Sequence, residues 1–239
     1  MFPELDDQQR IIFPDPEEAD REGLLASGGN LSPGVLLSAY EQGIFPWYSG
    51  DSPILWWSPD PRCILWPSKR HMSRSMQKLI RMKKFTVKFD TVFSEVIQRC
   101  AGINRKNEDG TWITQEMINA YCRLHDLGYA HSVEVWESGR LAGGLYGLSL
   151  GKIFFGESMF SEEKNSSKLA FLTLAEFLEE NDFVFLDCQI YSEHLGTMGA
   201  EIMTRREYLM HLANNRGESG LYGSWQRFNQ HLSVIHDRK

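Results

Sequence analysis

The pattern of apolar and polar positions divides the chain into a turn-rich N-terminal part and a longer part of helices and strands. Ser32 to Gln42 is predicted to be a helix, because Ser32 can cap it, Pro33 suits its first turn and Gly43 ends it. The next segment, from Ile44 to Pro67, holds four of the seven Trp and five of the nine Pro residues. Proline removes a donor from a strand ladder, so this segment predicts loops and short extended pieces and no regular central strand.

Helical and strand periods alternate after Pro67, with helices expected at 68–82, 92–101, 114–127 and 165–179 and strands at 85–89, 130–136, 140–149, 152–157 and 183–191. Short glycine-containing connections at ESG and LG predict antiparallel hairpins. The expected class is α+β: a small aromatic-rich domain over 1–62, and over 63–239 a mainly antiparallel sheet flanked by helices. This order resembles the acetyltransferase-like (GNAT) core. Coenzyme A is disfavoured, because ESMFSEEKNSSKLA lacks the glycine turn that would hold its pyrophosphate.

The last predicted strand, FVFLDCQIY at 183–191, ends in polar groups. Positions i and i+2 share a face of a strand, so Asp187 and Gln189 are expected side by side and able to hydrogen-bond, with Cys188 facing away. An aspartate at the end of a strand is often only a turn former. A carboxylate buried in an apolar run needs donors, and it is therefore also a candidate for chemistry.

Composition limits the possible functions. The chain has 239 residues, 42% of them hydrophobic, which allows a substantial core. It has no apolar run long enough to span a bilayer and no secretory signal, so a soluble cytoplasmic protein without membrane contact is expected. The four Cys and seven His residues show no ligand spacing, so neither a metal nor a disulfide framework is expected.

Charge is distributed unevenly along a chain whose net charge is −7. The stretch 61–89 has no Asp or Glu and nine of the 25 basic residues. Four of them, Arg70, Arg74, Lys78 and Arg81, follow one face of the predicted helix 68–82. Such a stripe suits either a solvated helix face or the phosphates of RNA or another polyanion, and these two interpretations stay open at this point.

Eight motifs, in order, resemble those of the leucyl/phenylalanyl-tRNA–protein transferase family: GIFPW, LWWSPDPR, GTWIT, HSVEVW, GGLYG, FFGESMFS, NSSK and DCQ. The resemblance covers about 13–212, and the tail 214–239 carries no recognised motif. It implies a bacterial cytoplasmic enzyme that moves Leu or Phe, and less readily Met, from aminoacyl-tRNA to a protein with N-terminal Arg or Lys, which marks that protein for degradation through the N-degron pathway. No cofactor or metal is implied, and a monomer is expected.

The resemblance also implies site residues. Asp187 and Gln189 would be the catalytic pair, Glu157 would hold the incoming amine, and Trp112 would stack on the terminal adenosine. An apolar pocket for the amino acid would be lined by Trp47, Leu145, Phe154, Met159, Phe171, Leu174, Leu178 and Leu186. The basic helix would bind tRNA through Arg70, Arg74, Lys78, Arg81, Lys83 and Lys84.

Catalysis would consist mainly of aligning two substrates and supplying a neutral amine. We expect the Gln189 amide to donate to Asp187, so that the Gln189 carbonyl can receive the amine proton. The tRNA ribose hydroxyl is the alternative proton carrier. Two rival interpretations are a thiol hydrolase built on Cys188 and His194, and a non-catalytic RNA-binding protein.

Overall fold

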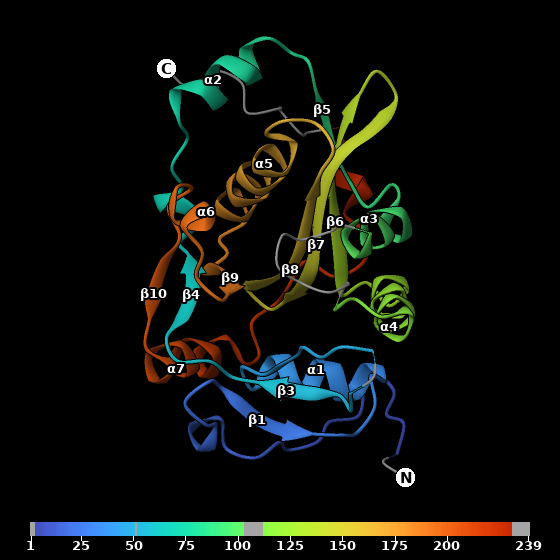
Figure 1. The fold of residues 1–239 in the computed structure, drawn as a ribbon, viewed down its shortest axis with the longest axis vertical. Helices are drawn as coiled ribbons and strands as arrows, with labels where there is room; N and C mark the ends of the chain where they lie inside the picture. Colours follow the sequence, from blue (N-terminus) through green and yellow to red (C-terminus); the bar gives the residue numbers. More distant parts are fainter. Residues whose placement is uncertain (1–2, 51, 103–111, 231–239) are drawn as a thin grey trace.

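The N-terminal part forms a small sheet against one helix in the computed structural model, which describes residues 3–50, 52–102 and 112–230. Strands β1 (Leu24–Ser27), β3 (Leu55–Trp57) and β2 (Phe45–Pro46) pair in that order, antiparallel throughout, beside a short turn of 3₁₀ helix, η1 (Pro16–Glu18). Helix α1 (Pro33–Glu41) follows Ser32 and is buried over almost its whole length. Figure 1 shows this part below the larger sheet.

A seven-stranded sheet organises the rest of the described chain, in the order β10-β4-β9-β8-β7-β6-β5. Its strands are β4 (Arg62–Leu65), β5 (Thr86–Phe89), β6 (Ala130–Glu137), β7 (Arg140–Leu150), β8 (Ile153–Ser161), β9 (Phe185–Gln189) and β10 (Glu201–Met203). Among the described residues β8 and β9 pair in parallel, and the other neighbouring pairs are antiparallel. The predicted hairpins at ESG and LG are confirmed, the first turning on Ser138 and Gly139, both with positive φ.

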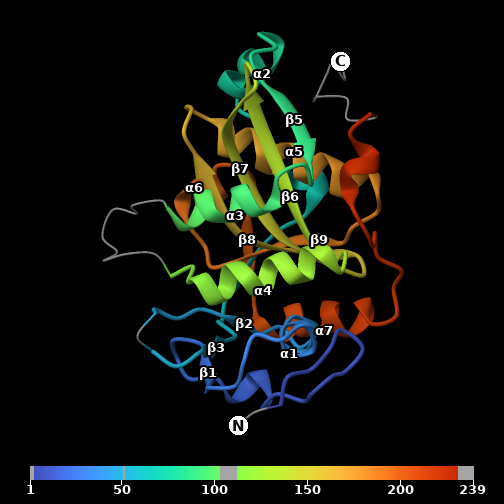
Figure 2. The ribbon, with the colours of Figure 1, turned by 90° about the vertical axis from the view of Figure 1, so that its right-hand side faces the viewer.

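Helices cover both faces of this sheet. Helices α3 (Phe93–Ala101) and α4 (Gln115–Asp126) lie on one face, and α5 (Ser166–Glu180) lies on the other, as Figure 2 shows. The first face shares one hydrophobic cluster with the N-terminal part, in which Val35 and Trp56 join Val96 and Tyr121. The N-terminal part is thus packed directly onto the sheet.

Strand β4 corrects the expectation that no regular central strand would lie between Ile44 and Pro67. It lies inside the large sheet, between β9 and β10, and it is buried at every position. Pro61 and Pro67 flank this four-residue strand and do not enter it, so neither proline removes a ladder donor.

The predicted helix 68–82 is broken in the structure. A turn of 3₁₀ helix, η2 (Pro67–Lys69), comes first, and α2 (Arg74–Arg81) begins only after Ser73, whose side chain accepts from the Met76 N–H. Pro67 and the Ser73 cap each start a separate element. Arg70 therefore lies outside the helix that carries the other basic residues.

The C-terminal region adds elements that the sequence patterns did not predict: α6 (Glu193–Gly196), β10, α7 (Arg205–Asn215) and the 3₁₀ helix η3 (Trp225–Phe228). Trp225 belongs to the tail without a recognised motif, yet it is fully buried and stacks on His131 with ring centroids 3.9 Å apart. Its backbone N–H donates to Asp90. The tail therefore completes the core on the α5 side. Among the described residues, no helix is both long enough and apolar enough to cross a membrane.

Candidate active site

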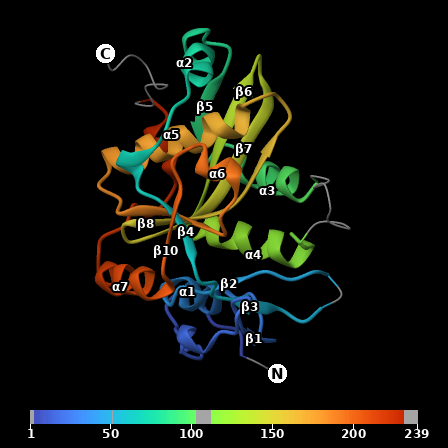
Figure 3. The same cartoon turned by 60° about the vertical axis from the view of Figure 1, so that its left-hand side comes forward.

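The parallel strands β8 and β9 separate at the point where the candidate residues lie. Figure 3 labels β8 and β4, the two strands that pair with β9, near the middle of the molecule. The register of β8 and β9 pairs Phe155 with Asp187 last, whereas β8 continues to Ser161 and β9 to Gln189. Each strand also has an irregularity here. Glu157 is the extra residue where β8 pairs with β7, and Cys188 is the extra residue where β9 pairs with β4. Bulges of this kind redirect side chains, and they are common next to active sites.

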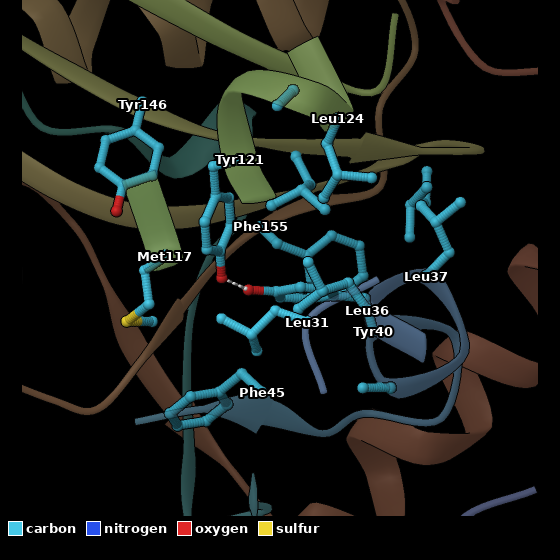
Figure 4. Packing of buried hydrophobic residues seen from close by; sticks show 14 of the residues in the cluster. Leu31, Leu36, Leu37, Tyr40, Phe45, Met117, Tyr121, Leu124, Tyr146 and Phe155 are labelled. Carbon is cyan, nitrogen blue, oxygen red and sulfur yellow. Dashed lines mark hydrogen bonds between the residues drawn. The ribbon is translucent and has the colours of Figure 1, made fainter. Parts of the chain in front are cut away.

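Glu157 is the centre of a polar cluster. Its carboxylate accepts from the Tyr40 hydroxyl at 2.7 Å, the Tyr121 hydroxyl at 3.0 Å and the Gln189 side-chain amide at 2.8 Å. The two hydroxyl oxygens are also within hydrogen-bond distance of each other, as Figure 4 shows. Two hydroxyl protons cannot serve all three contacts at once, so a proton on Glu157 would complete the set. Both rings are fully buried, one in α1 and one in α4, so the N-terminal part and the sheet domain both hold this carboxylate in place.

Burial raises the pKa of Glu157 to about 7, and the negative charge of Asp187 acts in the same direction. The donated hydrogen bonds lower the pKa and offset part of that shift. A carboxyl group with a pKa near neutrality can hold or release a proton at physiological pH. The phenol pKa values of Tyr40 and Tyr121 are raised well above the ordinary value, mainly by burial, so both act as neutral donors.

Gln189 and Asp187 do not interact as expected. The Gln189 side-chain amide donates to Glu157 and not to Asp187; the link to Asp187 Oδ1 comes instead from the Gln189 backbone N–H, at 2.8 Å. Gln189 has a φ of 61°, in the left-handed region, and the Ile190 N–H closes a tight turn onto the Cys188 carbonyl at 2.8 Å. The alternation of a regular strand has ended here, so the rule that placed the two side chains side by side does not apply.

The Asp187 carboxylate is fully buried behind this turn. It forms a bidentate ion pair with Arg62, at 2.9 and 2.7 Å, and it accepts a hydrogen bond from the Tyr208 hydroxyl at 2.7 Å. The expectation that a buried carboxylate needs donors is therefore met. Asp187 lines neither of the two cavities described next.

An apolar cavity of about 100 Å³ opens beside Glu157. Five of the residues expected in the amino-acid pocket line it, namely Leu145, Met159, Phe171, Leu174 and Leu186. The apolar cavity is also lined by residues that the sequence analysis did not assign to it: Tyr146, Gly156, Glu157, Ser158, Cys188 and Leu195.

Three residues assigned to that pocket lie elsewhere. Phe154 and Leu178 are fully buried in the core, where Phe154 packs against Trp225, and neither lines the apolar cavity. Helix α5 turns Phe171 and Leu174 toward the cavity, whereas Leu178, one turn beyond Leu174, packs into the core. Trp47 lines a different cavity.

That second cavity, of about 210 Å³, is more polar and shares Glu157 and Cys188 with the first. Its other walls are Phe45, Pro46, Trp47, Trp112, Gln189 and Ile190. The two tryptophans expected to contact substrate therefore face the same space as the Gln189 turn. Because both cavities meet at Glu157, a bond formed between a ligand in each would form beside that carboxylate.

Cys188 does not face away from Gln189, because the bulge brings it onto the wall of both cavities. Burial, together with the neighbouring Cys63, raises the pKa of its thiol well above the ordinary value, and its sulfur lies 3.8 Å from the Leu186 carbonyl oxygen. A protonated thiol is a poor nucleophile. These observations disfavour the thiol-hydrolase interpretation.

The basic residues differ in how freely they present their charge. Arg70 is paired with Glu179 and Glu176, and Lys84 with Glu137 and Glu163. Of the six residues expected to bind tRNA, the other four are exposed and have no carboxylate partner among the described residues: Arg74, Lys78, Arg81 and Lys83. Within this set, the unpaired positive charge therefore lies on α2 and at Lys83, just after it.

Sequence reasoning missed four buried groups of the site, Tyr40, Arg62, Tyr121 and Tyr208. One signal was available, because a carboxylate buried in an apolar strand requires donors, and Arg62 opens the apolar run CILW. The tyrosines carried no such signal, since a tyrosine in an apolar helix is ordinarily a core residue.

Comparison with known proteins shows the family to which the chain belongs. A family model described as leucyl/phenylalanyl-tRNA protein transferase matches residues 64–213, and a model of that family's N-terminal domain matches residues 29–60. The chain belongs to this transferase family. It is therefore an aminoacyltransferase.

Curated members of the transferase family resemble the chain over most of its length. The leucyl/phenylalanyl-tRNA–protein transferase of Desulfatibacillum aliphaticivorans is 53% identical over 91% of this chain and 93% of its own. The protein of the same name from Myxococcus xanthus is 49% identical over 92% of this chain and 94% of its own. Among solved structures, L-PGS from Bacillus licheniformis is 11% identical with a TM-score of 0.39, covering 54% of this chain and 45% of that one.

Proposed function

We propose that this protein transfers Leu or Phe, and less readily Met, from aminoacyl-tRNA to the N-terminal Arg or Lys of an acceptor protein. The observation that carries the proposal is the pair of cavities, one apolar and one polar, that meet at Glu157 in a chain of this family. The modified protein would then carry a destabilising N-terminal residue and enter the N-degron pathway.

The apolar cavity is proposed to hold the side chain of the donor amino acid. Its walls consist of aliphatic and aromatic groups with few polar atoms, so a charged or strongly polar side chain would lose hydration without a partner there. One methylene is worth only about 1 to 3 kcal/mol in such a site, so selection among Leu, Phe and Met would be graded.

The polar cavity is proposed to receive the terminal adenosine of the tRNA and the acceptor's N-terminus. Trp112 would stack on the adenine, and Trp47, 36% exposed, would offer a second ring at the rim. Glu157 in its ionised form would attract the cationic acceptor, and the aromatic faces favour a guanidinium or ammonium group.

The reaction is aminolysis of an ester. The acceptor nitrogen attacks the ester carbonyl carbon, the bond to the ribose oxygen breaks, and the tRNA leaves as its hydroxyl form. The contact between the Gln189 amide and Glu157 directs the Gln189 carbonyl oxygen to the amine proton. An α-amino group has a pKa of about 7.7 to 8.0, and the carboxylate of Glu157, with a pKa of about 7, is basic enough to take that proton. In the alternative, the ribose hydroxyl relays the proton from the amine to the leaving oxygen.

Asp187 is proposed to act from behind Gln189. Its carboxylate holds the Gln189 backbone and does not touch the substrates. Glu157 and Gln189 are thus the proposed catalytic residues, and Asp187 holds Gln189 in position. Proximity of this kind can contribute about 7 to 11 kcal/mol when the reacting atoms are aligned.

Helix α2 is proposed to bind the tRNA backbone through Arg74, Lys78 and Arg81, together with Lys83. Their exposure and lack of carboxylate partners in the described chain support this role. Phosphate neutralisation needs clustered cations of this kind. Arg70 and Lys84 would contribute less, since carboxylates already neutralise them.

The architecture is proposed to be that of the acetyltransferase-like family, with a small domain over 1–62 and the transfer domain over 63–239. The parallel β8–β9 pair in an otherwise antiparallel described sheet supports it, as does the gap between the two family models at residues 61–63. We further propose a cytoplasmic monomer.

A direct test is transfer of labelled Leu from charged tRNA to a peptide that begins with Arg. The expected result is label in the peptide, with strong loss for Gln189→Ala and Glu157→Gln, and no transfer to the same peptide with an acetylated N-terminus. Binding of charged tRNA without any transfer would instead favour the non-catalytic RNA-binding alternative, which has no support among the curated relatives.

A further inference from the structure

Arg62 is a buried cation at the centre of the molecule, with 1% of its surface exposed. Its Nε and Nη2 atoms donate to the two oxygens of Asp187, and the Tyr208 hydroxyl donates to one of the same oxygens. The guanidinium also lies 4.5 Å from the centre of the Tyr208 ring. These three residues come from β4, β9 and α7, and we call them the Arg62 cluster.

The Arg62 cluster touches one wall of the polar cavity through Asp187. The Asp187 carboxylate accepts the Gln189 N–H at 2.8 Å, and Gln189 has the left-handed backbone conformation that closes the turn. A non-glycine residue in this conformation is strained and persists only where surrounding contacts enforce it. The Asp187 carboxylate supplies one such contact.

The same cluster contacts a second residue of the cavity wall, Phe45, through Arg62. Its Nη1 donates to the Gly43 carbonyl at 3.2 Å, and its guanidinium lies over the Phe45 ring at 4.8 Å. Phe45 lines the polar cavity together with Gln189, and it comes from the N-terminal part. One side chain therefore links the two parts of the protein at the cavity that both of them form.

Stability alone is a weak explanation for such a cluster. Desolvating two charges costs several kcal/mol, and apolar residues of similar volume are often as stable. A buried bidentate ion pair does, however, fix the relative positions of the groups that it joins. Here the geometry sets where the Gln189 turn and Phe45 lie relative to each other.

We propose that Arg62 and Tyr208 are positioning residues for aminoacyl transfer, which fix the Gln189 turn and the Phe45 wall at the distance that aligns the incoming amine. The inference rests on the proposed function. The cluster acts through Asp187 on Gln189 and touches neither substrate. Loss of a cluster contact therefore slows the chemical step and leaves the binding of charged tRNA nearly unchanged.

The test is a double-mutant cycle on the full chain, with transfer of labelled Leu as the readout. Tyr208→Phe removes one hydroxyl and keeps the ring over Arg62. It is expected to lower kcat about 10- to 100-fold, with the KM for Leu-tRNA within about twofold of wild type. In an Asp187→Asn background the same change is expected to have no further effect, because Tyr208 acts through that carboxylate.

Arg205→Lys is the matched control. Arg205 is likewise a buried arginine, 7% exposed, and it donates to the Ser58 carbonyl, but it belongs to neither cavity. Its substitution is expected to lower the midpoint of thermal unfolding without changing kcat. Arg62→Lys, which keeps the charge and loses the two-pronged contact, is expected to lower kcat and leave the KM nearly unchanged.

The inference is overturned if Tyr208→Phe retains wild-type kcat, if its effect adds fully to that of Asp187→Asn, or if Arg205→Lys loses kcat to the same extent at equal stability. Absence of transfer by the wild-type protein would instead refute the proposed function, so the two failures are distinguishable.

Discussion

At the residue scale, Glu157 shows how one carboxyl group acquires its properties from its surroundings. In the unfolded chain it is an ordinary glutamate, and folding buries it among two phenols and an amide. Burial raises its pKa to about 7, which makes its charge depend on pH in the physiological range. The ionised form is the one that can attract the cationic acceptor and take a proton.

The rate of transfer is therefore expected to rise with pH through about 7, as Glu157 ionises. A raised pKa means that the carboxyl group is protonated, and inactive as a base, below that value. The measurement is kcat/KM against pH for the wild type and for Glu157→Gln. The acceptor amine titrates in both proteins, so it serves as an internal control. If the rise of kcat/KM near pH 7 persists unchanged in Glu157→Gln, the titrating group is not Glu157.

At the element scale, two bulges and a short helix shape the cavities. The bulges turn Glu157 and Cys188 toward the site, and α6, capped by Ser192, brings Leu195 to the edge of the apolar cavity. None of these features follows from a strand or helix period. A period describes regular elements, and the walls of this site are formed where the elements stop being regular.

Leu195 is expected to influence the choice of amino acid. Leu195→Phe adds volume at the half-buried edge of the apolar cavity, so it should reduce kcat/KM for Phe-tRNA more than for Leu-tRNA, by about tenfold. The control is Leu221→Phe, a half-buried position that lines neither cavity. Equal losses for the two charged tRNAs would place the donor side chain elsewhere.

At the scale of the whole molecule, an acidic protein carries a separate basic surface. The net charge is −7, yet α2 and the residues after it present four unpaired cations in the described chain. Figure 1 places α2 beyond α5, at the opposite end of the sheet from the N-terminal part. A long, charged ligand that spans the molecule suits this separation between the basic surface and the cavities.

Reversing charge on α2 should weaken tRNA binding without slowing the chemistry. Lys78→Glu with Arg81→Glu is expected to raise the KM for Leu-tRNA and to reduce its salt dependence, while kcat stays near wild type. Arg21→Glu with Arg206→Glu, at two exposed sites away from α2, makes the same change in net charge and serves as the control. If this control raises the KM as much as the α2 variant does, the effect is one of total charge.

The sequence by itself determined the elements whose signal is local. Helix α1 with its proline start, the strands β5 to β9, helices α3 to α5 and the basic segment all follow from period, caps and charge. The order of motifs was enough to indicate the family. Five residues that the resemblance assigned to the amino-acid pocket line one cavity in the structure, and their role there stays a prediction. A helix or strand period alone does not assign such positions.

Tertiary structure alone decided which groups meet. Asp187 pairs with Arg62, 125 positions earlier in the chain, and Glu157 contacts Tyr40, 117 positions earlier. Sequence periodicity describes neighbours within one element, whereas a buried charge selects its partners from every element that surrounds it. The expected contact between the Gln189 amide and Asp187 was wrong for this reason: a bulge and a left-handed residue redirected the side chain toward a carboxylate on another strand.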